Sequence, residues 1–334
     1  MEKTGIIDHR KFDRKVRLLS ALSRVPILST FALRRLVKLR FDTFFETRWT
    51  TETSIGWPRQ FPESTVGGPG IPEASRSAVS VSDIGSGITR NGAFIVRGLV
   101  QPSQIALLRK SIQSAYDSHD RSNGDLTFVS EWFTPFQPDP IEGVDTTIER
   151  NWFRGSGAVL GADSPRGLFN LLKCFEESGI VDIVEEYLGE RPALSVRKTS
   201  LRRVDADQTE TGWHQDGAFL GTDIRTMNVW IALSDCGDDA PSMEMVPKRL
   251  NEIAPTGTPG ALMSWTVSPE VVAEVAGDTP PVHLKFSAGD AIFFDEMNLH
   301  RTSSRPHFSR PRYAIEAWFF APSCYPLDQL PLLV

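Results

Sequence analysis

The sequence predicts a mainly β protein with flanking helices, whose core is a double-stranded β-helix (a jelly-roll or cupin-like double sheet) with helices packed on one side. Two observations carry this prediction. Helical spacing of apolar residues dominates the chain up to residue 189, whereas short strand-like runs divided by Gly, Pro and Asp dominate from residue 192. Helices followed by strands, without βαβ alternation, indicate an antiparallel β core.

The individual elements follow from the period of the apolar residues. Helices are predicted at residues 80–92, 102–119, 168–177 and 180–189. Strands are predicted at residues 92–100, 193–204, 227–235, 283–295 and 312–322. Residues 123–165 are irregular, and the aromatic-rich part at 128–153 is typical of a binding loop or lid.

The chain is predicted to have two parts. Residues 1–75 form a basic extension that ends in a Pro/Gly-rich connector, and residues 76–334 form the β-helix domain. Residues 1–48 carry a charge of +7 on a chain of net charge −6, so the remainder carries −13. Residues 31–45 have the pattern of a basic amphipathic helix, which would pack on the acidic body, on a second subunit of a homodimer, or on an anionic membrane.

Composition excludes several classes of protein. The negative net charge provides no electrostatic footprint for nucleic acid. The three cysteines are far apart and include no CxxC pair, which argues against a disulfide framework and favours a reducing, cytoplasmic setting. The uncharged run at residues 25–33 is too short to span a bilayer and lacks the cleavage site of a signal peptide.

The stretch TGWHQDGAFL contains the first candidate metal ligands. His214 and Asp216 are two residues apart, so in an extended segment both side chains lie on one face. A structural histidine beside a turn aspartate would give the same pattern, so a third ligand is needed. His300, which follows an apolar strand, is the best candidate, and His283 and His307 are weaker ones. Two histidines and one carboxylate are the facial triad of non-haem iron(II).

A second set of residues fits a carboxylate cosubstrate. Arg312 stands at the start of the last strand-like run, and its planar guanidinium matches a carboxylate in a bidentate geometry. The hydroxyl of Thr302, two residues after His300, would bind the same carboxylate. Arg310 is the alternative to Arg312, and a surface salt bridge is the alternative role for either arginine.

These motifs together resemble the phytanoyl-CoA dioxygenase family of iron(II)/2-oxoglutarate oxygenases. The resemblance covers roughly residues 84–322 and rests on GAFIVRGLV, WHQD, NVWIALSD, AGDAIFFD, His300 and RYAI. It implies that His214, Asp216 and His300 bind Fe(II), that Arg312 and Thr302 bind the far carboxylate of 2-oxoglutarate, and that O₂ is the other cosubstrate. Residues 1–75 have no counterpart in the family pattern, and SMEMVPKRL stands where the family often has a Pro-Gly-Ser-His turn.

The resemblance implies a function but no substrate. Related halogenases replace the carboxylate ligand with a small residue, so Asp216 makes hydroxylation of a small organic molecule, in biosynthetic tailoring, the first expectation. Desaturation, epoxidation, ring formation, demethylation of macromolecules and a non-catalytic metal-binding cupin-like module are the alternatives. Candidate substrate contacts are Trp213, Phe219, Arg202 and Trp230, with core packing as the alternative role for each aromatic residue.

Overall fold

The structure is a computed structural model that describes residues 9–46, 57–64, 66, 70–207, 211–221, 224–326 and 329–334. The chain divides into two compact units. Unit 1 takes its described residues from Met1–Ser54, Ala106–Arg202 and Ala317–Val334, and unit 2 takes them from Ile55–Ile105 and Arg203–Glu316.

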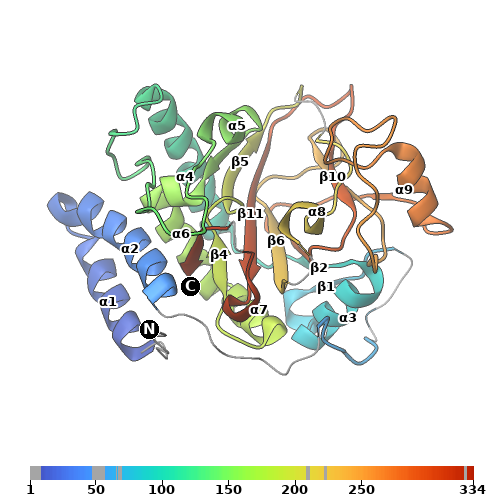
Figure 1. Ribbon diagram of the computed structural model, residues 1–334, viewed down its shortest axis with the longest axis horizontal. Coiled ribbons are helices and arrows are strands. Elements are labelled where there is room, and N and C mark those ends of the chain that lie inside the picture. Colours follow the sequence, from blue (N-terminus) through green and yellow to red (C-terminus); the bar gives the residue numbers. More distant parts are fainter. Residues whose placement is uncertain are drawn as a thin grey trace. The chain divides into compact units, whose positions relative to one another are not determined.

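Unit 2 is built on two β-sheets (Figure 1). Of the nine strands of the larger sheet, unit 2 contains, in spatial order, β1 (Glu73–Ser75), β2 (Ala93–Arg97), β9 (Ala291–Phe294), β6 (Thr226–Ala232) and the first part of β11 (Arg312–Phe320). The smaller sheet has the order β10 (His300–Ser303), β7 (Ser242–Met245), β8 (Val282–His283). β1 and β2 are parallel, whereas β9 pairs antiparallel with β2 and β6, and β7 pairs antiparallel with β8 and β10.

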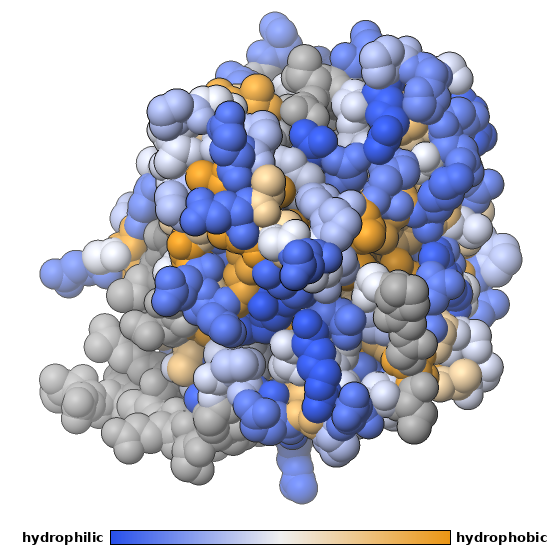
Figure 2. Space-filling view, turned by 90° about the vertical axis from the view of Figure 1, so that its right-hand side faces the viewer, coloured by the Kyte–Doolittle hydropathy of each residue, from blue (hydrophilic) through white to orange (hydrophobic). Residues whose placement is uncertain are grey.

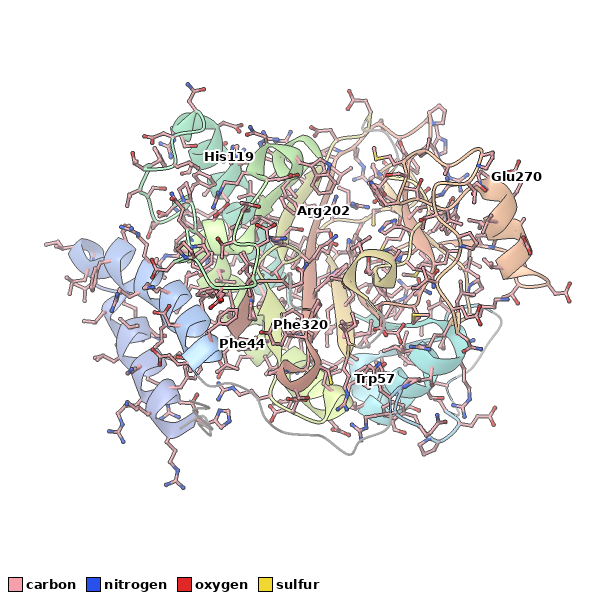
Figure 3. All side chains as sticks on the ribbon, viewed as in Figure 1. Phe44, Trp57, His119, Arg202, Glu270 and Phe320 are labelled. Atoms are coloured by element: carbon pink, nitrogen blue, oxygen red, sulfur yellow. The ribbon has the colours of Figure 1, made fainter. Side chains whose placement is uncertain are left out.

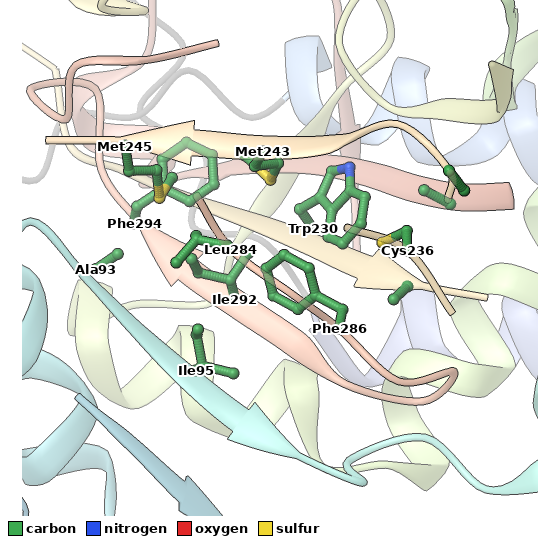
Figure 4. Packing of buried hydrophobic residues seen from close by; sticks show 13 residues of the cluster. Ala93, Ile95, Trp230, Cys236, Met243, Met245, Leu284, Phe286, Ile292 and Phe294 are labelled. Carbon is green, nitrogen blue, oxygen red and sulfur yellow. The ribbon is translucent and has the colours of Figure 1, made fainter. Parts of the chain in front are cut away.

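Alternate residues of these strands form one hydrophobic core, which Figure 4 shows from close by. Eight of its thirteen buried members come in pairs two positions apart on these strands: Ala93 and Ile95, Trp230 and Ala232, Met243 and Met245, Ile292 and Phe294. Side chains two apart on a strand share a face, so the cluster joins the inner faces of β2, β6, β7 and β9. Burial of each Ile or Phe side chain contributes about 1.5–3 kcal/mol. The predicted mainly β core with flanking helices is confirmed.

Unit 2 also contains short helices with clear sequence signals at their ends. α3 (Val81–Asn91) begins at a capping box formed by Ser80 and Asp83, and it ends at Gly92, whose φ of 81° is left-handed. α9 (Pro269–Ala276) begins with the Ser268 hydroxyl capping the Val271 amide. α8 (Gly217–Leu220) is a single turn. The face of the molecule in Figure 2 is mostly hydrophilic, and apolar residues are visible mainly in its recesses.

Unit 1 is mainly helical. Its helices are α1 (His9–Leu22), α2 (Pro26–Glu46), α4 (Pro102–Ser122, begun in unit 2), α5 (Arg150–Gly155), α6 (Pro165–Glu177) and α7 (Ile180–Leu188). Its strands are β3 (Ala158–Leu160), β4 (Ala193–Ser195), β5 (Ser200–Val204), β12 (Pro331–Leu333) and the last part of β11. Within the described ranges, none of the helices combines the length and the apolar character that crossing a bilayer requires.

The predicted amphipathic helix at residues 31–45 lies inside α2, which packs on its own unit. Its last turn buries Phe44 against Ala193 and Phe320, as Figure 3 shows for the two labelled phenylalanines. The Arg40 guanidinium donates a hydrogen bond to the Leu333 carbonyl at 2.6 Å. These contacts fix α2 at its C-terminal half. The predicted boundary at residue 75 stays a prediction, and residues 1–8, 47–56, 65 and 67–69 of the proposed extension lie outside the described residues.

Several element boundaries differ from the sequence prediction for local reasons. Residues 193–204 form two strands instead of one, because the Ser195 hydroxyl and carbonyl accept bonds from the amides of Lys198 and Thr199 and thereby close a turn. Residues 283–295 likewise contain β8 and β9, separated by a turn in which the Asp290 carboxylate accepts the Ser287 amide. The irregular region predicted at 123–165 includes α5 and β3 near its end, and β7, β10 and α9 were not predicted.

Candidate metal centre

The backbone at His214 pairs with His300 of β10, whereas Asp216 stands at the turn that begins α8 and has helical φ and ψ of −65° and −30°. His214 and His300 exchange backbone hydrogen bonds of 2.9 and 3.0 Å, so the two imidazoles lie side by side. The Gln215 side chain lies on the opposite face, where its amide donates to the Met297 carbonyl at 2.9 Å. His214 and Asp216 lie together as the sequence predicts, although Asp216 is at a helical turn and not in the extended backbone from which this was predicted.

His214, Asp216 and His300 bring their ligand atoms together. One atom from each residue lies within 4.8 Å of the others, a spacing that allows all three to bind one ion. The His214 Nε2 atom is 3.8 Å from Asp216 Oδ1, and the centroids of the two imidazole rings are 4.4 Å apart. Asp216 and His300 are buried, with exposed fractions of 3% and 7%, while His214 is less buried.

Backbone carbonyls fix the tautomer of both histidines. The Nδ1 atom of His214 lies 2.9 Å from the Gly212 carbonyl oxygen, and that of His300 lies 3.1 Å from the Asn298 carbonyl oxygen. A carbonyl can only accept, so each Nδ1 carries the proton and each Nε2 presents a lone pair. Two neutral imidazoles and one carboxylate are the donor set that suits iron(II), and the residues present therefore fit this metal.

Asn228, in β6, donates a hydrogen bond to the carboxylate of the candidate ligand Asp216. Its Nδ2 atom donates to Asp216 Oδ2 at 3.4 Å, which leaves Oδ1 on the side of His214. A carboxylate held by a second residue keeps its ligand oxygen in position without a rearrangement when a metal binds. The sequence signal for this role was an amide residue within the apolar strand NVWIALSD, and it was not recognised.

Aromatic rings border the ligand set on several sides. Phe294 contacts the His300 ring at a centroid distance of 4.8 Å, and Trp265 contacts the His214 ring edge-on at 5.5 Å. Phe219, which the sequence suggested as a substrate contact, is stacked 6.4 Å from the His214 ring. Trp265 was not predicted, because its loop has no strand or helix pattern. These rings give the candidate metal centre apolar surroundings, which limit the access of water.

Arg312 is among the most deeply buried charged residues of unit 2, with an exposed fraction of 1%. Its Nη1 atom donates to the Ser242 carbonyl at 3.1 Å, and its guanidinium carbon lies 5.3 Å from the centre of the Trp230 ring. Thr302 in β10 pairs with Met243 in β7, the residue next to Ser242. Strand β7 therefore brings Thr302 and Arg312 to one region.

Strand β7 also pairs with the residue of β10 that is a candidate metal ligand, so its register gives the position of Thr302 relative to His300. In the β7–β10 register, His300 pairs with Met245 and Thr302 pairs with Met243. Two residues along a strand span about 6–7 Å, and their side chains share a face. His300 and Thr302 thus lie on the same face at a separation suited to a short dicarboxylate.

The weaker candidates have other contacts. His283 and His307 lie within hydrogen-bond distance of the carbonyls of Gly237 and Asp238. Neither histidine belongs to the metal-binding group that the described residues form. Arg310 is exposed and forms an ion pair with Asp239.

The remaining predicted substrate contacts have structural partners. Trp213 is buried beneath the Arg301 guanidinium, whose carbon lies 4.9 Å from the ring centre. Trp230 contacts Phe286 in the core as well as Arg312. Arg202, in unit 1, donates to the Ser156 carbonyl at 3.2 Å. Roles for these residues in substrate binding stay predictions.

The segment that departs from the family pattern contains a buried ion pair. Arg249 Nε lies 2.5 Å from Asp295 Oδ2, and Arg249 Nη2 lies 3.6 Å from Glu296 Oε1. Burial raises the pKa of Asp295, and burial together with the charge of Asp295 raises the pKa of Glu296 to about 8. The Thr226 hydroxyl donates to Glu296 Oε2 at 2.6 Å. Arg249 thus holds two buried acids beside it.

A family model described as phytanoyl-CoA dioxygenase (PhyH) matches residues 88–310 of the chain. The chain belongs to this family. The PhyH protein is therefore a non-haem iron dioxygenase that uses iron(II), 2-oxoglutarate and O₂. The matched range includes all three candidate metal ligands and ends just before Arg312.

Solved structures agree with the fold of this PhyH protein. EctD from S. alaskensis in its apoform is 14% identical, with a TM-score of 0.53 over 78% of this chain and 85% of EctD. EctD crystallised with 2-oxoglutarate and 5-hydroxyectoine is 14% identical, with a TM-score of 0.52 over 73% of this chain and 78% of EctD. At this identity the likeness concerns the fold alone. No protein of curated function matches the sequence.

Proposed function

We propose that this PhyH protein hydroxylates an unactivated C–H bond of a small organic substrate, in a biosynthetic tailoring reaction. The observation that carries the proposal is the convergence of two imidazoles of fixed tautomer and one carboxylate, with ligand atoms within 4.8 Å of one another. In this proposal His214, Asp216 and His300 bind iron(II). The intact carboxylate ligand favours hydroxylation over halogenation, because no ligand position is left for a halide.

Arg312 and Thr302 are proposed to bind the far carboxylate of 2-oxoglutarate. Arg312 is a buried guanidinium, and a buried cation favours the binding of an anion because water screens it poorly. The Trp230 ring and the Ser242 carbonyl hold the guanidinium plane in position. Thr302 shares a strand face with His300, which supports a cosubstrate that reaches from Arg312 to the metal ligands.

With O₂, bound iron(II) and 2-oxoglutarate supply an oxidative decarboxylation that yields succinate and CO₂ and oxidises a substrate C–H bond. The protein's own part is to hold the ligands, to orient the cosubstrate and to limit water. Phe219, Trp265 and Phe294 are proposed to do the last of these, since their rings contact the two histidine ligands. An apolar border of this kind favours an apolar substrate of modest size.

The first experiment is an anaerobic titration of the metal-free protein with iron(II) and then 2-oxoglutarate, recorded as the visible charge-transfer absorption of the chelate. We expect a band in the wild type and in His307→Ala, and no band in His214→Ala. His307→Ala is a matched control, because this histidine lies outside the metal-binding group. A normal band in His214→Ala would overturn the ligand assignment.

The reaction type is tested with a panel of small apolar molecules, under dioxygen labelled with a heavy isotope. Hydroxylation predicts substrate-stimulated succinate release and a product that gains one labelled oxygen atom. A product that lacks two hydrogen atoms and gains no oxygen would contradict hydroxylation and establish desaturation or ring formation by the same centre.

A further inference from the structure

The turn between α1 and α2 exposes a cluster of apolar side chains (Figure 1 shows the two helices). Ile27 has an exposed fraction of 93%, and Leu18 and Phe31 are exposed by 61% and 60%. All residues from Arg24 to Leu28 are exposed, including Val25. Turns of globular proteins are ordinarily polar, and contiguous exposed apolar residues mark interaction surfaces.

Basic residues surround this turn. No acidic residue occurs between Asp13 and Asp42, whereas eight basic residues do: Arg14, Lys15, Arg17, Arg24, Arg34, Arg35, Lys38 and Arg40. Lys38 pairs with Asp42 and Asp139. Within the described part of the chain, Arg34 and Arg35 are exposed and have no ion-pair partner. The hairpin is therefore a basic and apolar surface on an acidic protein.

The surface continues into a hollow beside α2, with a volume of about 460 Å³. Phe31, Arg34 and Arg35 belong to both the hairpin surface and the hollow. The facing loop contributes Leu126 and Val129, which are exposed by 53% and 50%. Apolar walls beside guanidinium groups suit a partner that offers hydrocarbon and negative charge together.

We propose that this surface, comprising residues 14–35 and the loop around Leu126 and Val129, docks the protein on an anionic lipid bilayer. The exposed turn would enter the boundary between headgroups and acyl chains, where apolar side chains leave water. Arg34 and Arg35 would contact lipid phosphates, because an anionic leaflet attracts nearby basic residues. The contact is peripheral, since no described helix is able to cross a bilayer.

A second copy of the chain fits this surface less well than a lipid bilayer does. It would supply acids for the arginines, since the chain outside residues 1–48 carries −13. It would supply few apolar partners: in the described part of the chain, the exposed large hydrophobic residues outside the surface are Leu107, Trp152, Leu262 and Met263. A bilayer offers phosphate and hydrocarbon over one continuous area.

The test is co-sedimentation of the full chain with phosphatidylcholine vesicles, with and without phosphatidylserine. We expect binding at least about tenfold tighter with phosphatidylserine, and weaker binding as salt rises. The double variants Ile27→Glu/Phe31→Glu and Arg34→Glu/Arg35→Glu should each lose about tenfold or more of this affinity. Leu262→Glu/Met263→Glu is the matched control, because both residues are exposed apolar residues of unit 2 and should be neutral.

All the substituted side chains are exposed, so the variants should keep the unfolding temperature of the wild type. Equal binding to both vesicle types, no binding, or an equal loss in the control variant would overturn the proposal. The alternative occupant, a second copy of the chain, is tested by measuring the molar mass of the protein by light scattering without vesicles. A dimer that Ile27→Glu/Phe31→Glu converts to monomer, together with absent vesicle binding, would assign the surface to a second copy of the chain.

Discussion

Unit 2 contains two buried polar clusters that differ in what their charged atoms face. In the cluster of Arg249, Asp295 and Glu296, both carboxylates lie beside a guanidinium of the same chain. In the candidate metal centre, the Asp216 carboxylate lies beside His214 and His300, whose Nδ1 protons point away to backbone carbonyls. The first cluster neutralises its charge internally, whereas the second directs three ligand atoms at one another.

The difference explains why similar residues have different roles. Lone pairs that face one another are unfavourable unless a cation lies between them, so the geometry of the metal centre is that of a site completed by an ion. A carboxylate beside a buried guanidinium needs no further partner, and the removal of either one leaves a buried charge. The two clusters should therefore respond oppositely to metal removal and to substitution.

The largest effect is expected for Asp216→Ala. Loss of the one carboxylate among the three proposed ligands should reduce iron-dependent succinate formation by about three orders of magnitude or more, because the remaining imidazoles carry no charge to bind the cation. The thermal unfolding of the metal-free variant should resemble that of metal-free wild type. Asp239→Ala, which removes an exposed acid, is the control. Retention of iron-dependent activity in Asp216→Ala would contradict the assignment.

Arg249→Met should have the opposite effect to Asp216→Ala. It should lower the stability of the protein and leave the three proposed metal ligands unchanged. Removal of one partner of a buried ion pair costs about 3–5 kcal/mol, since Asp295 and Glu296 would remain buried beside an apolar side chain. The measurement is urea unfolding of the metal-free protein. Arg249→Met/Asp295→Asn should recover part of the loss, and an unchanged midpoint in the single variant would show that the pair contributes nothing.

The same cluster predicts a pH dependence. Burial and the charge of Asp295 raise the pKa of Glu296 to about 8 in the folded protein, above its ordinary value of 4.5. The folded state then binds the proton more tightly than the unfolded state, so stability falls as pH rises from about 4.5 to about 8. At about 1.4 kcal/mol per pKa unit, the destabilisation is on the order of 5 kcal/mol. Glu296→Gln should flatten this dependence in the metal-free protein, and an identical slope in both proteins would refute the raised pKa.

Arg312→Lys tests the buried guanidinium that we propose binds the far carboxylate of 2-oxoglutarate. Lysine keeps the charge but loses the planar fork, so the 2-oxoglutarate concentration for half-maximal turnover should rise about 100-fold. Iron affinity without 2-oxoglutarate should stay unchanged, and Arg310→Lys should have no effect on either quantity. A loss of iron affinity in Arg312→Lys would place this residue with the metal ligands instead.

Features with local causes were predictable from the sequence. The HxD spacing predicts that His214 and Asp216 lie close together, and Ser80 and Gly92 mark the ends of α3 through capping that involves only neighbouring residues. Arg312 was separated from Arg310 because it stands directly before an apolar run, and the structure buries the former and exposes the latter.

Features that depend on pairing across the chain were not predictable. The pairing of β7 with β10, which relates Thr302 to His300, joins segments about sixty residues apart. Trp265 contacts His214 from a loop without a periodic pattern. The acids after AIFF resemble an ordinary polar turn, and only the approach of Arg249 shows that they are buried as an ion pair.

The smallest effect is expected for Asn228→Leu. This variant removes the residue that contacts the Asp216 carboxylate and keeps the three proposed metal ligands. Asn228 contacts Asp216 Oδ2 and is not one of the three proposed ligands, so its loss removes one hydrogen bond and leaves the proposed donor set intact. Iron affinity should fall about tenfold, as expected when a residue that orients a metal ligand is removed.

Asn228→Asp tests whether residue 228 lies close enough to the ion to affect its binding. A second carboxylate next to Asp216 repels the Asp216 carboxylate in the metal-free protein, and it attracts the cation when iron(II) binds. We expect this variant to lose stability without metal and to regain it with iron(II), measured as the unfolding temperature in both states. A difference from wild type of the same size in both states would mean that residue 228 lies too far from the ion to affect it.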